Sequence, residues 1–130
     1  MNKRNLFAGT ALATLLSSAT FGASAGEFGS YPVFISDGMR YASGSMVSAR
    51  YSSDDVQRIE CRTFAHALGM VSATCYAKNA QGLTRTCFTT VPVLVENAKA
   101  AGSESLITFR WYENGDCESI TIENASRWKR

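Results

Sequence analysis

Four cysteines are the residues of this chain best able to do covalent or metal chemistry. They are Cys61, Cys75, Cys87 and Cys117. Structural zinc sites bring their thiolates in close pairs such as C-x-x-C, and this spacing has no close pair. A thiol oxidoreductase needs the same C-x-x-C pair, so redox catalysis is not indicated either. An even number of widely spaced cysteines predicts two disulfides, provided that the chain reaches an oxidising compartment.

The N-terminus meets this condition, because it has the three parts of an export signal. Lys3 and Arg4 give a positive start, residues 6–16 are mainly apolar but too few to span a bilayer, and residues 23–25 are Ala-Ser-Ala. We therefore predict a signal peptide over residues 1–25 and a mature chain from Gly26, secreted or periplasmic. Because Gly26 is not a cysteine, attachment of a lipid to the new N-terminus is not indicated.

The charge balance of the mature chain argues against nucleic acid as a partner. The full chain has 13 Lys and Arg against 11 Asp and Glu, and two of the basic residues leave with the signal peptide. The mature chain is then close to neutral, whereas binding to a phosphate backbone needs a surplus of basic side chains. No second apolar stretch approaches membrane-spanning length, so we expect no membrane insertion after cleavage. Residues 26–130 have room for a single domain.

The remaining residues with catalytic potential are one histidine and two acidic groups. His66 is the only histidine, and it falls in an expected loop with no indicated partner to orient it. The acidic groups are Asp54 with Asp55, and Glu113 with Asp116 and Glu118. Such carboxylates can act as acid–base pairs or calcium ligands, but neither group has a calcium-loop spacing and both fit turns. We therefore predict no catalytic residue, no metal and no cofactor.

The patterns of the mature chain predict short strands and one helix. They indicate strands over residues 56–64, 70–78, 83–89, 106–113 and 116–123, and one strand or two short ones over 39–51. Residues 26–38 read as loosely ordered, with a short edge strand over 31–35. Pro92 and Gly102 bound the one helix. The fold class is then mainly β with one short helix (α+β), either a small antiparallel sheet packed on the helix or a compact sandwich, disulfide-stapled, and we favour the first.

One turn bears on how the cysteines pair. The run Asn-Ala-Gln-Gly at 79–82 predicts a three-residue hairpin loop with its glycine in the left-handed conformation. Asn79 then lies opposite Leu83, and Cys75 opposite Cys87 as a hydrogen-bonded pair whose side chains diverge. We therefore favour disulfides Cys61 with Cys75 and Cys87 with Cys117. The alternatives, Cys75 with Cys87 plus Cys61 with Cys117, or Cys61 with Cys87 plus Cys75 with Cys117, stay open.

A second hairpin is predicted by Asn114-Gly115, a dipeptide typical of type I′ turns, with Glu113 opposite Asp116. This register gives one apolar face, which we expect in the core: Ile107, Phe109, Trp111, Ile120 and Ile122. The other face is mainly polar and holds Thr108, Arg110, Tyr112, Ser119, Thr121 and Glu123, together with Leu106 and Cys117. The polar face is the one we expect to meet solvent.

Aromatic residues beside arginine and small polar residues are typical of sugar-stacking and protein-contact surfaces. On the polar face of the second hairpin this combination occurs in Tyr112, Arg110, Thr121 and Ser119. We therefore predict that these four side chains bind a partner, which is a protein or a glycan.

The chain also resembles a group of small exported bacterial proteins. The resemblance depends on the run S-x-D-x-V-Q-x-I-x-C, which ends at Cys61 here, and on the three later cysteines. It covers the chain from about Gly44 to Ser126. It implies a single domain whose cysteines are structural, and it transfers no functional residue.

These observations favour an exported, disulfide-containing domain that binds a protein or glycan without catalysing a reaction. One alternative is a small hydrolase of the cell envelope that uses His66 or the acidic groups for acid–base chemistry. Another is a passive structural protein of the envelope that has no ligand.

Overall fold

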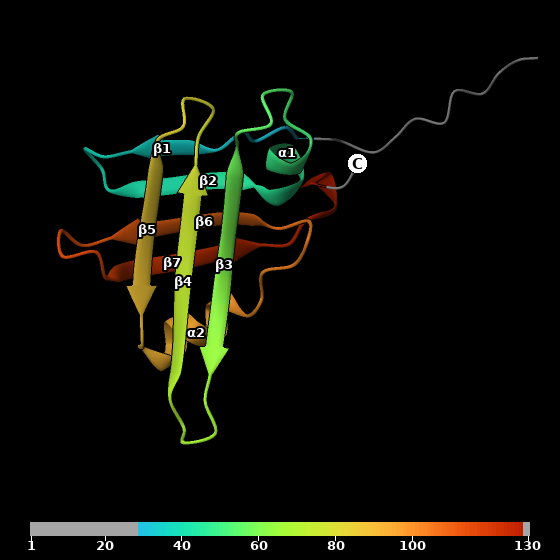
Figure 1. Cartoon of the computed structure of the whole chain (residues 1–130). Coiled ribbons are helices and arrows are strands. Elements are labelled where there is room, and N and C mark those ends of the chain that lie inside the picture. Colours follow the sequence, from blue (N-terminus) through green and yellow to red (C-terminus); the bar gives the residue numbers. More distant parts are fainter. Residues whose placement is uncertain (1–28, 129–130) are drawn as a thin grey trace, which may run out of the picture.

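Residues 29–128 are described by the computed structural model shown in Figure 1. In chain order the elements are β1 (Phe34–Ser36), β2 (Tyr41–Ser45), α1 (Met46–Arg50), β3 (Arg58–Ala65), β4 (Val71–Lys78), β5 (Thr84–Thr89), α2 (Pro92–Ala98), β6 (Leu106–Trp111), β7 (Cys117–Glu123) and the 3-10 turn η1 (Ser126–Trp128). The expected signal peptide and its cleavage site lie outside the described residues.

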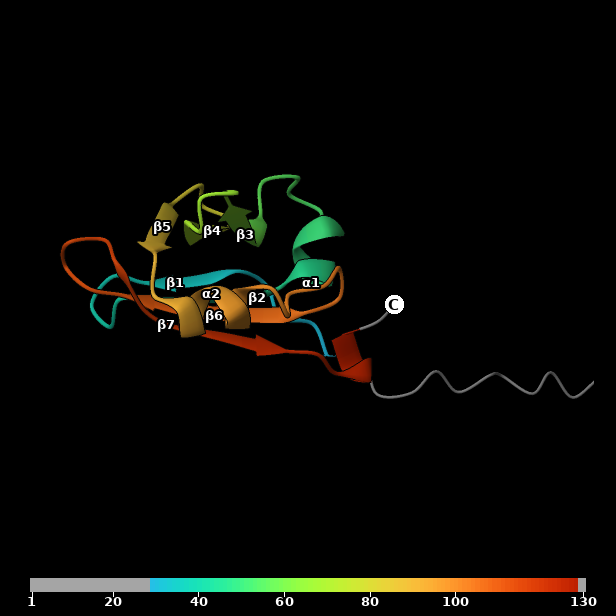
Figure 2. The ribbon, with the colours of Figure 1, turned by 90° about the horizontal axis from the view of Figure 1, so that it is seen from below.

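The strands form two antiparallel sheets that pack face to face. One sheet has the order β1-β2-β6-β7 and the other β3-β4-β5, and the strands of one run across those of the other (Figures 1 and 2). Helix α2 contacts β7 of the first sheet and β3 and β4 of the second, so it closes one edge of the sandwich. The mainly β, α+β fold class is confirmed. The favoured arrangement, one sheet on a helix, is wrong, because the middle strands form a layer of their own.

The core fills the space between the two sheets. Small side chains on both inner faces, among them Ala42, Ala73 and Ala77, are fully or almost fully buried and let the sheets approach. Phe109 supplies the largest fully buried side chain, and its ring lies 5.9 Å from that of Trp111. Of the five core residues predicted for the second hairpin, Ile107, Phe109, Trp111 and Ile120 are buried and Ile122 is half-buried.

Residues 46–50 form helix α1, where the alternating pattern predicts a strand. Ser45 ends β2 and caps the helix, because its Oγ accepts a hydrogen bond from the backbone N–H of Ser48 at 3.2 Å. Val47 and Ala49 are the buried residues of α1. Two buried residues separated by the half-buried Ser48 satisfy a strand pattern as well as one short helical turn, which explains the error.

The described part of the stretch expected to be loosely ordered is packed into the fold. Strand β1 forms one edge of the four-stranded sheet, and Val33 before it is only 6% exposed. The backbone N–H of Val33 donates to Oε1 of Gln57 at 2.7 Å. A Cβ on Gly44 would lie 3.0 Å from Val33 Cα, so the glycine allows this close approach. Burial of one valine against the sheet is the physical reason why this stretch is held in place.

Three of the hairpins among the described residues, β3–β4, β4–β5 and β6–β7, have the same type of loop. In each loop the first residue donates its N–H to the carbonyl oxygen of the residue four positions later in the chain. The carbonyl oxygen of the first residue accepts a hydrogen bond from the N–H of a glycine three positions later. The closing residues and glycines are His66 with Gly69, Asn79 with Gly82, and Tyr112 with Gly115. The glycine φ angles are 88°, 83° and 89°, the left-handed region in which a Cβ is strained. The predicted loop at 79–82 is thereby confirmed.

The loop at 112–116 differs from its prediction. A type I′ turn needs positive φ at both central residues, and Asn114 is not among the described residues with positive φ. The loop is closed by Tyr112, whose N–H donates to the carbonyl of Asp116 at 2.9 Å, and not by Glu113. The register between the strands should therefore shift by one residue.

A β-bulge restores the expected register further along this hairpin. Trp111 lies opposite Cys117, but Arg110 lies opposite Ser119, so Glu118 is the extra residue. Beyond the bulge the inner-face pairs are those predicted, including Phe109 with Ile120. Between the loop and the bulge, Cys117 turns to the core side and is 4% exposed, so its predicted place on the polar face is wrong. Leu106, predicted on the same polar face, is also buried.

Both disulfides follow from this arrangement. Cys61 lies directly opposite Cys75 in the β3–β4 pair, with 4.0 Å between their Cα atoms, and the two are bonded. Cys87 bonds Cys117 across the two sheets. Cys75 and Cys87 are opposite each other as expected, yet each bonds a different partner. This is the pairing that the sequence analysis favours.

Candidate binding face

The outer face of the four-stranded sheet is open, because the other sheet covers only its inner side (Figure 2). Strand register places two rows of side chains across all four strands on this face. One row is Phe34, Ser43, Thr108 and Thr121, and the other is Ser36, Tyr41, Arg110 and Ser119. We call these eight residues the open face. Each row crosses the sheet in about 14 Å, since neighbouring strands lie about 4.8 Å apart.

Three of the four predicted binding residues lie on the open face. Arg110 is directly opposite Ser119, and Thr121 is opposite Thr108 in the next row. Tyr112 lies just beyond, in the loop after β6, and its side chain is about half exposed. Local alternation along one hairpin was enough to group these residues.

Arg110 is held in position at one end of the open face. Its Nη2 donates to the carbonyl of Met39 at 3.2 Å, and its Nε lies 3.6 Å from Oε2 of Glu118. These residues help to line a hollow of about 210 Å³ beside the sheet. Glu118 reaches Arg110 because the bulge displaces it, and sequence reasoning missed this contact since nothing local indicates the bulge.

The open face carries two further aromatic rings that sequence reasoning did not place there. The rings of Phe34 and Tyr41 lie 5.6 Å apart with a tilt of 43° between their planes. Phe34 is 54% exposed although it is a large apolar residue. Their place on the face depends on the pairing of β2 with β6, which are more than 60 residues apart.

Hydroxyl groups occupy most of the remaining positions. Ser43 Oγ and Thr108 Oγ1 lie 2.7 Å apart on adjacent strands and hydrogen-bond to each other. A hydroxyl group both donates and accepts, so such a row can exchange hydrogen bonds with a ligand that is itself rich in hydroxyl groups. The open face thus combines hydroxyls, the exposed ring of Phe34 beside the half-buried ring of Tyr41, and one anchored guanidinium.

The carboxylate of Asp54 is the titratable group with the most perturbed pKa among the described residues. Its oxygens accept hydrogen bonds from Ser52 Oγ at 3.1 Å, from the N–H groups of Val56 and Gln57 at 2.8 and 3.1 Å, and from Gln57 Nε2 at 2.6 Å. The bonds from the Gln57 side chain and the Val56 backbone lower the pKa of Asp54 to about 2. A carboxyl group held ionised in this way is unsuited to act as a general acid near neutral pH.

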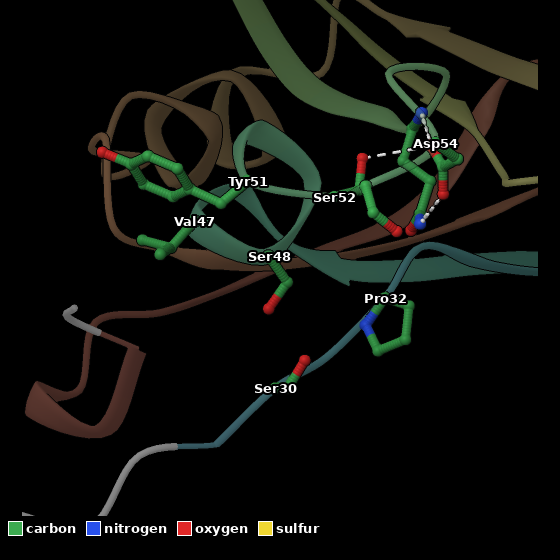
Figure 3. Close-up of a pocket in the computed structure, with 9 residues that line it drawn as sticks. Ser30, Pro32, Val47, Ser48, Tyr51, Ser52 and Asp54 are labelled. Carbon is green, nitrogen blue, oxygen red and sulfur yellow. Dashed lines mark hydrogen bonds between the residues drawn. The ribbon is translucent and has the colours of Figure 1, made fainter.

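Asp54 borders a hollow of about 220 Å³ between α1 and the chain before β1, which Figure 3 shows. The hydrogen bonds of Asp54 run to its own loop and not across the hollow. Asp55, the neighbouring residue, has a φ of 54° and belongs to the same turn. The acidic pair therefore shapes the loop before β3.

Three of the other candidates for acid–base chemistry, His66, Asp116 and Glu118, also have local partners. Nδ1 of His66 accepts a hydrogen bond from the N–H of Leu68 at 3.1 Å, within the β3–β4 loop. Asp116 accepts from Nδ2 of Asn114 at 3.0 Å, and Glu118 faces Arg110. Within residues 29–128 no group of three or more His, Cys, Asp or Glu side chains is placed to hold a metal ion.

Comparison with known proteins gives no match: no protein-family model fits the chain, and no curated protein and no solved structure is significantly similar to it. The resemblance to small exported bacterial proteins therefore stays a prediction. Among the described residues no helix has the length and apolar character needed to cross a bilayer.

Proposed function

We propose that the protein is a non-enzymatic binding module and that the open face of its four-stranded sheet is where the partner binds. The observation that carries the proposal is the pair of rows that cross all four strands, in which hydroxyl, aromatic and guanidinium groups lie together, exposed or half-buried. A face that served only to meet solvent would not need exposed Phe34 beside Tyr41.

A glycan fits this surface better than a protein does. The partner has to hydrogen-bond with serine and threonine hydroxyls and to pack against flat rings, and a sugar ring offers hydroxyl groups on its rim and C–H groups on its faces. Arg110 supplies a fixed donor at one end of the rows. A protein contact surface of comparable strength would be expected to have a larger buried apolar centre.

The two disulfides support the same proposal. Two disulfides are typical of proteins that work in oxidising compartments, where envelope and extracellular glycans are found. Of the groups that a hydrolase would require, Asp54, Asp116 and His66 are hydrogen-bonded within their own loops, and Glu118 faces Arg110. The binding function is therefore proposed in place of a catalytic one.

The test is to titrate the purified protein against a glycan array and, in parallel, to capture partners from secreted proteins. Replacing an anchor residue such as Arg110→Ala or Tyr112→Ala should weaken binding about tenfold. Thr86→Ala, on the outer face of the other sheet, is the control and should bind like the wild type. Binding that survives both Arg110→Ala and Tyr112→Ala, or no binding to any glycan or protein, would contradict the proposal.

A further inference from the structure

A second exposed surface lies at the far end of the three-stranded sheet, where large apolar side chains gather. The β3–β4 hairpin extends beyond the rest of the molecule there, next to the turn between β5 and α2 (Figure 1). The exposed residues of this apolar end are Phe64, Leu68, Met70, Phe88, Val91 and Val93. Leu68 at the tip of the hairpin is 83% exposed, the most of any large apolar residue described.

Charge is missing from the same end. Residues 63–77 and 86–95 contain no Asp, Glu, Lys or Arg, although such residues make up 18% of the chain. These two segments supply the hairpin tip, the adjoining halves of β3 and β5, and the start of α2. An exposed apolar surface without charged residues is typical of a site that leaves water when it meets its partner.

The fold does not require apolar residues at the tip. The three hairpins have the same loop, and the position taken by Leu68 in the first is taken by Gln81 in the second and Asn114 in the third. Polar residues therefore suit this position of the loop at least as well. A leucine that is neither buried nor needed for loop geometry, and that lies among other exposed apolar side chains, points to a role outside the fold.

Behind the tip, the outer face of the sheet is hollowed. Phe64 of β3 lies opposite Ser72 of β4, and Phe88 of β5 lies opposite Thr74. The two phenylalanines help to line an open hollow of about 450 Å³ together with Met70 and Pro92. Apolar groups that enter this hollow would bury both rings.

A basic side chain adjoins the apolar end on the same face. Arg62 precedes Phe64 by two residues, so it lies about 7 Å further from the tip. Its side chain is 70% exposed, and its Nε is 3.4 Å from Glu60, which makes a closer contact of 2.9 Å with Arg58. Arg58, Arg62 and Lys78 outnumber Glu60 on the outer face of these strands.

We infer that the apolar end docks on the surface of an anionic phospholipid bilayer, with Leu68, Phe64, Met70 and Phe88 in the interface and Arg62 at the lipid phosphates. Apolar side chains at such interfaces enter about 5 to 10 Å, and Arg62 stands at the matching height above Phe64. A protruding hairpin suits a bilayer, which needs no complementary pocket, better than it suits a rigid protein partner. Docking of this kind is peripheral, and it leaves the open face on the other sheet free.

Vesicle co-sedimentation of the purified protein tests the inference, which does not rest on the proposed function. Vesicles of phosphatidylcholine alone and of phosphatidylcholine mixed with phosphatidylglycerol are compared. The wild type should bind both, with preference for the anionic vesicles. Leu68→Glu should lower the partition coefficient at least about tenfold, the scale of one leucine leaving an apolar environment. Arg62→Ala should remove the preference for anionic vesicles.

The matched control is Leu83→Glu, in the corresponding hairpin at the other end of the same sheet. It should bind vesicles like the wild type, and urea unfolding should show that both Glu variants are folded. The inference is overturned if the wild type binds no vesicles, if Leu68→Glu binds as well as the wild type, or if Leu83→Glu loses binding equally. Self-association of the wild type that Leu68→Glu abolishes, without vesicle binding, would also overturn it in favour of a second copy of the chain.

Discussion

The loops at the two ends of β3 differ in how their side chains are used. Before the strand, the polar loop that contains Asp54 is held by four hydrogen bonds to that one carboxylate. After the strand, the loop 66–70 is closed by backbone bonds and by Nδ1 of His66, and Leu68 at its tip projects into solvent.

This contrast shows that residue type alone does not identify a functional position. Asp54 has the chemistry of a catalytic acid, yet its oxygens are occupied by the loop that they stabilise. Leu68 has the chemistry of a core residue, yet it contributes nothing to the core. The satisfied polar group is structural, and the exposed apolar group is the one without a structural reason.

The largest expected effects come from removing the two disulfides, one of which lies halfway along β3. Removing the Cys61–Cys75 disulfide with a double substitution to alanine should lower the free energy of unfolding by about 3 kcal/mol, because it frees a loop of 14 residues in the unfolded chain. Removing the Cys87–Cys117 disulfide should lower the free energy of unfolding slightly more, since this bond closes a longer loop of 30 residues. Urea unfolding measures both, and a cost below about 1 kcal/mol would show that unfolded-state entropy is not the main contribution.

A smaller effect is expected from the glycine of the apolar loop. Gly69→Ala places a Cβ on a residue with a φ of 88°, and this strain should lower the free energy of unfolding by about 1 to 2 kcal/mol. No atom lies within 4 Å of that Cβ, so the loss would come from the backbone conformation and not from a clash. Gly82→Ala in the polar hairpin should cost the same, because the loop is the same. Gly38→Ala is the control, as Gly38 has neither positive φ nor a close neighbour. Unequal costs at Gly69 and Gly82 would break the equivalence of the two loops.

In the polar loop the expected effect depends on pH. The pKa of Asp54 is lowered from 3.8 to about 2, so its ionised form stabilises the folded state above the unfolded pKa, and this contribution is lost as the pH falls through about 2. Asp54→Asn should therefore be less stable than the wild type at pH 7, and the difference should shrink below about pH 4. Unfolding midpoints measured from pH 7 to pH 2 test this.

The control for the acid series is Asp55→Asn, which alters the adjacent carboxylate but removes none of the four hydrogen bonds to Asp54. Asparagine also tolerates the positive φ of that position. A constant difference between Asp54→Asn and the wild type across this range would mean that ionisation of Asp54 contributes nothing to stability.

Features set by a few neighbouring residues were predictable from the sequence. The loop after Asn79 was predictable, because an asparagine and a glycine three residues apart specify it locally. The inner-face register of the last hairpin was also predicted, but through two errors that cancel. The loop is one residue longer than a type I′ turn, and the bulge at Glu118 compensates for it.

Features that depend on distant pairing were not predictable. Phe34 and Tyr41 join the open face only because β1 and β2 pair with the C-terminal hairpin, and no local pattern encodes that pairing. The burial of Cys117 depends on the bulge, which no turn residue announces. For the apolar tip the sequence predicts only a loop and the start of a strand. The exposure of its side chains was not predictable, since exposure cannot be inferred from residue type.

The smallest effect on stability is expected where the effect on binding should be largest. Leu68→Gln gives the apolar loop the residue that the β4–β5 loop has at the same position. The free energy of unfolding should therefore change by no more than about 0.5 kcal/mol. The reciprocal change Gln81→Leu should be equally neutral, and it should create a second apolar tip at the opposite end of the sheet. If Leu68→Gln instead destabilised the protein by more than about 1 kcal/mol, the leucine would have a structural role, and the contrast between the two ends of β3 would fail.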